Sequence, residues 1–196
     1  MKKLILSLLV AAFVGGNTLS AQTITKNEDG KYSLSVGHVT LTVDAQKGGK
    51  IVSYRYDDKE ILSQTKIPNS FGSTFWTSPQ SEWNWPPVPE YDTKPFNAEV
   101  AGDKLILTGE KSKRFGYRVR KELTTDKKDN AIVITYTIIN ESGETRKVAP
   151  WEISRVPNGG ILFFDAKEVT PANNMETMPF VYEKKAAWYT LDERRK

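Results

Sequence analysis

Cysteine is absent from the 196-residue chain, and histidine occurs once, as His38. Without cysteine the protein has no disulfide framework, no thiolate nucleophile and no cysteine metal site. With one histidine, Ser-His-Asp hydrolysis is possible only through His38, and a metal centre with several histidines is excluded. The sequence also lacks a phosphate-binding glycine loop, a zinc helix and a dinucleotide fingerprint. We therefore expect no metal site and no cofactor.

A long apolar run occurs at the N-terminus, where residues 4–14 follow Met1-Lys2-Lys3 and precede small residues that end at Ala21. The run is too short to span a bilayer and polar sequence follows it, which is typical of a cleaved secretory signal. The alternative is a buried N-terminal helix. We expect residues 1–21 to be a signal peptide and residues 22–196 to form one domain. The protein would then be periplasmic or secreted and would not span a membrane.

A strong excess of charge of one sign is also lacking. The chain has 28 Lys and Arg against 24 Asp and Glu, a net charge of +4, and loss of Lys2 and Lys3 with the signal leaves +2. So small a charge predicts no nucleic-acid partner. Arg114, Arg118 and Arg120 still gather in one region. They form either a solvated polar face or a set of guanidinium forks for an acidic sugar.

Alternation of apolar and polar residues dominates the rest of the sequence. Residues 38–44 alternate strictly, as a half-buried strand requires, and similar runs occur at 51–56, 105–108, 117–123, 131–139 and 161–164. Turn signals separate these runs at intervals of about ten residues, and no stretch shows sustained helical periodicity. The pattern predicts an all-β antiparallel sandwich. The run 132–139 is apolar or β-branched on both faces, so we expect it to be a central strand covered on both sides.

Aromatic and proline residues concentrate in residues 71–96, which hold three of the five tryptophans and five of the ten prolines. Prolines 86, 87 and 89 cannot donate to a β-ladder, so we expect a long loop rather than a central strand. Stiff loops with exposed indoles suit sugars, because sugar rings have apolar C–H faces. The alternative is that the aromatics fold inward and cap an open end of the sandwich. The candidate ligand-binding residues here are Trp76, Trp83, Trp85 and Tyr91.

A second candidate site is the segment Trp151-Glu152-Ile153-Ser154-Arg155. On a strand, Glu152 and Ser154 share one face, while Trp151 and Arg155 share the other. Trp151 and Arg155 form one wall of a sugar site in this interpretation. In the plainer alternative, Trp151 belongs to the core and Glu152 pairs with a surface lysine.

The opening of the chain resembles a known superfamily. The stretch Gly48-Gly49-Lys50-Ile51-Val52-Ser53, the stretch Glu60-Ile61-Leu62 and the aromatic loop after them are similar to the start of the galactose-mutarotase-like β-supersandwich. The stretches 75–80, 83–87 and 151–154 also resemble a bacterial family of exported proteins, the DUF4380 type. The resemblance implies a supersandwich, whose usual length exceeds that of residues 22–196. It therefore implies either that the sequence is truncated at its C-terminus or that this protein has a shorter form of the fold.

Mutarotase chemistry does not follow from this resemblance. Aldose mutarotases use two histidines from the middle of the domain and a glutamate near the C-terminus, and His38 lies too early to match either histidine. The acid or base candidates are four carboxylates, and a glycosidase would need two of them about 5–10 Å apart. These candidates are Glu82, Glu90, Asp92 and Glu152.

Taken together, the sequence predicts an exported β-sandwich that binds or processes carbohydrate, its sugar held by the aromatic loop. The alternative from another class is a non-catalytic structural or protein-interaction module of the cell envelope. An epimerase is disfavoured by the single histidine.

Overall fold

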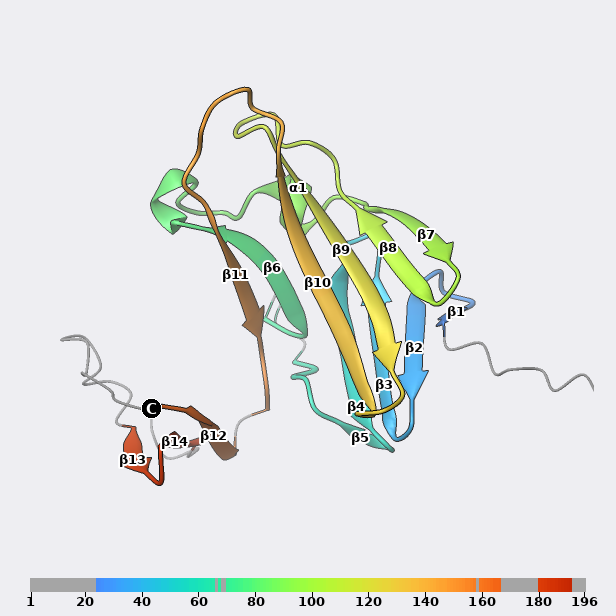
Figure 1. The fold of residues 1–196 in the computed structure, drawn as a ribbon, viewed down its shortest axis with the longest axis vertical. Coiled ribbons are helices and arrows are strands. Elements are labelled where there is room, and N and C mark those ends of the chain that lie inside the picture. Colours follow the sequence, from blue (N-terminus) through green and yellow to red (C-terminus); the bar gives the residue numbers. More distant parts are fainter. Residues whose placement is uncertain (1–23, 66, 68–69, 158, 167–179, 192–196) are drawn as a thin grey trace, which may run out of the picture.

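Antiparallel β-sheet makes up nearly all of the regular structure in a computed structural model of the chain (Figure 1). The structure describes residues 24–65, 67, 70–157, 159–166 and 180–191, so the expected signal peptide lies outside the described residues. Two sheets, called sheet A and sheet B, pack face to face (Figure 1). The prediction of an all-β antiparallel sandwich is confirmed.

Sheet A has the strand order β1-β2-β3-β4-β6-β11, and the short β5 pairs with β4 outside this path. Its consecutive strands are joined by tight turns up to β5. The last strand, β11, comes from much later in the chain and pairs with β6. The strands are β1 (Ile24–Lys26), β2 (Tyr32–Val36), β3 (Val39–Asp44), β4 (Lys50–Tyr56), β5 (Lys59–Glu60), β6 (Ser73–Ser78) and β11 (Ala149–Ser154).

Sheet B is a meander with the order β10-β9-β8-β7. Strands β9 and β10 pair along ten residues, from Tyr117 opposite Asn140 to Asp126 opposite Ala131. The strands are β7 (Asn97–Ala101), β8 (Lys104–Thr108), β9 (Tyr117–Asp126) and β10 (Ala131–Asn140).

A third, small sheet lies apart from the sandwich, after β11 (Figure 1). It has the order β12-β14-β13, and its first strand contains the run 161–164 that was predicted as a strand. Its strands are β12 (Gly160–Asp165), β13 (Val181–Glu183) and β14 (Ala186–Leu191). Four consecutive apolar side chains of β12 are exposed, those of Ile161, Leu162, Phe163 and Phe164.

The core lies between sheets A and B and follows from the period of two. Leu34 and Val43 of sheet A and Leu105, Leu107 and Val119 of sheet B have no exposed surface. Each belongs to an alternating strand, so every second side chain points inward. Burial of such side chains is the main favourable contribution to folding, at about 25 cal/mol for each Å² of apolar surface.

Two expectations about strand positions are wrong. Strand β10 was expected in the middle of a sheet, but it is the edge strand of sheet B, and Val133 on its outer face is 46% exposed. A strand with apolar or β-branched residues on both faces reflects either burial of both faces or a high intrinsic β-propensity. In β10, propensity explains the pattern better than burial does. The segment 71–96 was expected to contain no central strand, yet its first part forms β6, between β4 and β11. The prolines that argued against a strand follow Ser78, where β6 has ended.

Candidate functional site

Four tryptophans gather where the segment after β6 folds back over β6 and β11. We call Trp76, Trp83, Trp85 and Trp151 the tryptophan cluster. The register of β6 and β11 places Trp76 directly opposite Trp151. The ring centroid of Trp76 lies 5.8 Å from that of Trp83, 6.1 Å from that of Trp85 and 5.8 Å from that of Trp151, all edge to face. This is the arrangement that aromatic quadrupoles favour.

Burial divides the cluster into packing and surface residues. Trp83 is 3% exposed and its Nε1 donates to the carbonyl of Thr77 at 2.9 Å; Trp76 is 7% exposed and its Nε1 donates to Asp92 Oδ1 at 2.8 Å. Trp85 is 68% exposed and Trp151 is partly buried. Among the predicted indoles, therefore, Trp85 presents an open face, Trp151 part of one, and Trp76 and Trp83 support them from beneath.

Tyr91 belongs to the short helix α1 (Pro89–Asp92), which covers one end of the sandwich. Its side chain is 1% exposed, and burial raises the pKa of its hydroxyl. The turn before β4 packs against α1 so closely that a Cβ on Gly48 would lie 2.3 Å from the carbonyl oxygen of Asp92. Tyr91 therefore caps the sandwich, as the inward-folding alternative describes, and offers no surface to a ligand.

Three of the carboxylate candidates lie in the segment between β6 and β7, and two of them have partners of their own. Glu90 is buried and forms an ion pair with Lys94 at 3.0 Å. Asp92 accepts the hydrogen bond from Trp76. Glu82 ends the 3-10 helix η1 (Gln80–Glu82), and its Oε2 is buried without a hydrogen-bond partner among the described residues.

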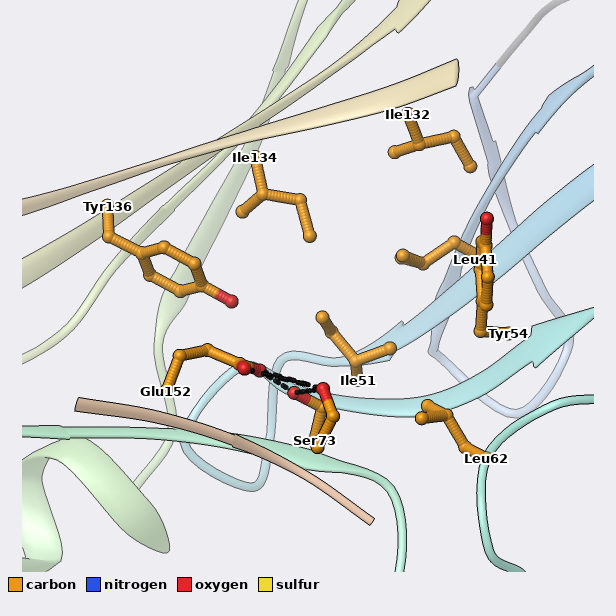
Figure 2. A pocket seen from close by; sticks show the side chains of 10 residues that line it. Leu41, Ile51, Tyr54, Leu62, Ser73, Ile132, Ile134, Tyr136 and Glu152 are labelled. Carbon is orange, nitrogen blue, oxygen red and sulfur yellow. Dashed lines mark hydrogen bonds between the residues drawn. The ribbon is translucent and has the colours of Figure 1, made fainter. Parts of the chain in front are cut away.

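The fourth carboxylate, Glu152, lines a groove between the two sheets (Figure 2). The groove has a volume of about 330 Å³. Its walls are mainly apolar, and at one end Glu152 accepts hydrogen bonds from the hydroxyls of Ser73 and Ser154. Partial burial raises the pKa of the Glu152 carboxyl, against the opposing effects of Ser154, Lys121 and Arg155. The apolar walls are Leu41, Ile51, Tyr54, Leu62, Ile132, Ile134 and Tyr136.

Strand alternation separates Glu152 from the tryptophan cluster, as the sequence predicted. Glu152 lies opposite Phe75 in the register, and Phe75 stacks on Tyr136 of sheet B with centroids 4.5 Å apart, so both face the interior. Trp151 and Trp76 point to the outer face of sheet A. Asp92 binds Trp76 there, and thus Asp92 and Glu152 contact side chains on opposite faces of the sheet. In the described part of the chain, Glu152 forms no ion pair with a lysine.

Arg155 follows β11 and reaches back over the outer face. Its Nη1 donates to Thr74 Oγ1 at 3.2 Å, and its Cζ lies 5.8 Å from the centre of the Trp76 ring. Arg155 therefore lies on the same face of sheet A as Trp76, the face that alternation predicts for Arg155 and Trp151. Of the other predicted arginines, Arg118 pairs with Glu141 and Arg120 with Glu122, as a solvated polar face does. Arg114 instead donates from its Nη2 to the backbone carbonyl of Glu82 at 2.7 Å.

Two buried lysines near these sites, Lys121 and Lys50, were not among the candidate site residues that the sequence singled out. Lys121 is buried inside the sandwich, where its Nζ donates to the carbonyls of Gly48 and Gly49 at 2.7 and 2.9 Å. Burial lowers the pKa of Lys121 to about 7. A signal was present, because Lys121 falls between Val119 and Leu123 in the apolar phase of its strand. Lys50, at the start of β4, carries no comparable signal.

The described residues contain no group of three or more His, Asp or Glu that is arranged to hold a metal ion. Within the same part of the chain, no helix has both the length and the apolar character that a membrane crossing requires.

Comparison with known proteins adds little to this site. No protein-family model matches the sequence, and no curated protein matches it. Among solved structures, the chain is similar to a 4-alpha-glucanotransferase from Thermococcus litoralis, with 13% identity and a TM-score of 0.36 over 69% of this chain. The match spans 24% of the glucanotransferase, so the chain corresponds to about a quarter of that protein. A likeness this distant carries no argument about function.

Proposed function

We propose that the protein is an exported carbohydrate-binding β-sandwich that holds a sugar ring against Trp85. The observation that carries this proposal is the contrast within the tryptophan cluster. Trp85 is 68% exposed, although it rests edge to face on the buried Trp76. An exposed indole that rests on a buried one offers a preformed apolar face, and a preformed face lowers the entropy lost on binding.

Groups around Trp85 can supply the polar part of sugar recognition. Trp151 offers part of its ring, and Arg155 lies on the same outer face, beyond Trp76. Pro86 and Pro87 follow Trp85 directly and restrict the backbone that carries it. We infer that the apolar face of Trp85 would stack on the C–H face of a pyranose, and that Arg155 would bind its polar groups.

Binding without hydrolysis is the function that the geometry supports best. A glycosidase needs two carboxylates on either side of one glycosidic bond. Glu90 is bound to Lys94, and Asp92 and Glu152 contact opposite faces of sheet A. Carbohydrate processing by Glu90, Asp92 and Glu152 therefore has no support in their arrangement.

Export and family membership are part of the same proposal. The basic start, the apolar run at residues 4–14 and the small residues before Gln22 support secretion into the periplasm or the medium. Mass spectrometry of the protein recovered from its native host tests this, because we expect the mature chain to begin at Gln22. The DUF4380-type and galactose-mutarotase-like resemblance also stays a proposal, supported by the Gly48-Gly49 turn and the aromatic segment after it.

Isothermal titration against a glycan panel tests the proposed function. We expect the protein to bind at least one oligosaccharide, and Trp85→Ala to weaken that binding at least tenfold while the protein stays folded. Tyr56→Ala is the matched control, because Tyr56 is another exposed aromatic, 53% exposed, on β4 outside the cluster. The proposal is overturned if no glycan binds, or if Trp85→Ala and Tyr56→Ala bind equally well.

A second candidate function is a structural or protein-interaction module of the cell envelope. It is favoured by β12, whose side chains from Ile161 to Phe164 are 44–63% exposed. Exposed apolar strands are typical of surfaces that contact another protein chain. Retained sugar binding after substitution of β12 would show that the two surfaces act independently.

A further inference from the structure

Two cations lie close together on the outer face of sheet A, beside the tryptophan cluster. Ile51 of β4 pairs with Ser73 of β6, so the neighbouring Lys50 lies next to Thr74 on the outer face. Arg155 reaches the same Thr74 hydroxyl at 3.2 Å. Lys50 is 5% exposed, and its Nζ lies 4.1 Å from the centre of the Phe71 ring.

Neither cation of this pair forms an ion pair with a carboxylate among the described residues. Among the described residues, neither Lys50 nor Arg155 has a carboxylate oxygen within 4 Å. Asp44 lies opposite Lys50 in the register but accepts a hydrogen bond from the backbone of Gln46. Asp92 attracts Lys50 and Glu152 attracts Arg155 from a distance, while their closest partners are the indole N–H of Trp76 and the hydroxyls of Ser73 and Ser154.

Electrostatic effects on Lys50 agree with this geometry. Burial lowers its pKa most, and the positive charge of Arg155 lowers it further, while Asp92 acts in the opposite direction. Burying one cation beside another costs stability unless a counter-charge is present. Proteins keep such costly arrangements mainly at sites that bind or react.

We propose that the sugar held by Trp85 is acidic, and that Lys50 and Arg155 bind its carboxylate or sulfate group. This inference rests on the proposed function. A guanidinium offers a planar fork of N–H donors that fits both anions, and an ammonium adds a point charge. Trp76 connects the two parts of the site, because its ring lies 6.1 Å from Trp85 and 5.8 Å from the Arg155 Cζ.

Paired acidic and neutral ligands test the inference. The full chain is titrated calorimetrically at low salt with oligogalacturonate, alginate oligosaccharide and chondroitin sulfate oligosaccharide. Each is compared with the neutral oligosaccharide made from it by carboxyl reduction and desulfation. Sodium sulfate is titrated separately, because it carries the anionic group without a sugar. The charge-changing variants are Lys50→Met and Arg155→Gln, and Trp85→Ala serves as the sugar-face variant.

Exposed cations of the same region provide matched controls. Lys59→Met and Arg55→Gln remove one positive charge each from exposed positions on β5 and β4. We expect an acidic oligosaccharide to bind at least tenfold more tightly than its neutral counterpart. Lys50→Met and Arg155→Gln should each remove most of this preference, the two controls should keep it, and added salt should weaken it. Trp85→Ala should weaken acidic and neutral ligands alike.

The remaining outcomes separate this inference from the proposed function. Equal binding of the acidic and neutral members overturns the inference and leaves a carbohydrate-binding protein. If sulfate binds, Arg155→Gln abolishes that binding and no sugar binds, the inference of an acidic sugar is overturned. The site would then bind anions without a sugar. No response to any ligand overturns both. If Lys50→Met does not fold, as judged by circular dichroism, Arg155→Gln decides, because Arg155 is only partly buried.

Discussion

Trp83 and Trp85 belong to the same segment, but one packs in the protein and the other lies at its surface. The two indoles are two positions apart, yet Trp83 is 3% exposed and Trp85 is 68% exposed. The hydrogen bond from Trp83 to Thr77 and its contact with Trp76 place it in the packed layer beneath the surface. At the residue scale, burial therefore decides whether an aromatic side chain stabilises the fold or remains available to a ligand.

Alanine substitutions should separate these two roles. We expect Trp83→Ala to lower the free energy of unfolding by about 3–5 kcal/mol, because it leaves a cavity beneath the cluster. Trp85→Ala should change the free energy of unfolding by less than about 0.5 kcal/mol, as exposed substitutions usually do. Urea denaturation followed by circular dichroism measures both. Similar losses for the two variants would contradict the assignment.

Lys121 should make the stability depend on pH. In the folded protein, burial lowers the pKa of Lys121 to about 7, although attraction to Glu152 and Asp92 acts in the opposite direction. In the unfolded chain the pKa keeps its ordinary value near 10.5. Between these values the unfolded state binds more protons, so stability should rise with pH from about 7 to 10, by at most about 1.4 kcal/mol per pH unit.

Urea denaturation at pH 7, 8 and 9 measures this rise. We expect Lys121→Met to flatten it, and the exposed control Lys59→Met to retain it. Since the burial of Lys50 acts in the same direction, the decisive quantity is the slope of Lys121→Met relative to the natural chain. Equal slopes would show that Lys121 keeps its charge when folded.

At the scale of elements, the turn before β4 and the helix α1 hold each other in place. The carbonyls of Gly48 and Gly49 accept hydrogen bonds from Lys121, and the backbone N–H of Gly48 donates to the carbonyl of Lys94 at 2.9 Å. α1 in turn carries Asp92, which binds the Trp76 indole. The position of the tryptophan cluster therefore depends on a close backbone contact far from it in sequence.

Gly48→Ala should disrupt this contact. A Cβ at Gly48 would lie 2.3 Å from the Asp92 carbonyl oxygen, and its φ of +65° disfavours any L side chain. We expect a loss of more than about 2 kcal/mol in the free energy of unfolding. Gly102→Ala is the control, since Gly102 has a similar φ of +63° but no atom within 4 Å of the added Cβ. It should lose only about 1 kcal/mol, and an equal loss in thermal or urea denaturation would refute the contact argument.

The whole molecule is a sandwich of two sheets, sheet A and sheet B, with a small third sheet after β11. β11 is the last strand of sheet A, β10 is the last strand of sheet B, and the groove with Glu152 lies between the sheets (Figure 2). Beyond β11, the small third sheet exposes apolar side chains of β12 and β13 instead of packing them on the core. Ile161, Phe163 and Val181 share one of its faces by register.

This exposed face should make the protein self-associate. We expect the sedimentation coefficient of the natural chain to rise with concentration, and the double variant Ile161→Lys with Val181→Lys to remain monomeric. Val100→Lys is the control, because Val100 on β7 is also exposed, at 42%. A natural chain that stays monomeric over the whole concentration range would show that the apolar face does not drive association.

Local pattern was sufficient to predict the class of fold. Alternation in residues 38–44 and 117–123 reports which side chains face the core, because successive residues of a strand point to opposite faces. The same rule predicts that Glu152 and Ser154 lie on the face opposite Trp151 and Arg155, as the pairing of β11 with β6 shows for residues 151–154. Turn residues at regular intervals also predicted the antiparallel connections.

Contacts between distant segments decided the rest, because no local pattern encodes them. The place of β10 at a sheet edge depends on which strands pair, and the place of β6 in sheet A depends on β11, more than 70 residues later. Trp76, Trp83 and Trp85 have the same side chain, and only packing against Thr77, Asp92 and Trp151 buries the first two and exposes the third. Lys50 and Arg155 become a pair only when β4, β6 and β11 align, because charge and burial act through space rather than along the chain.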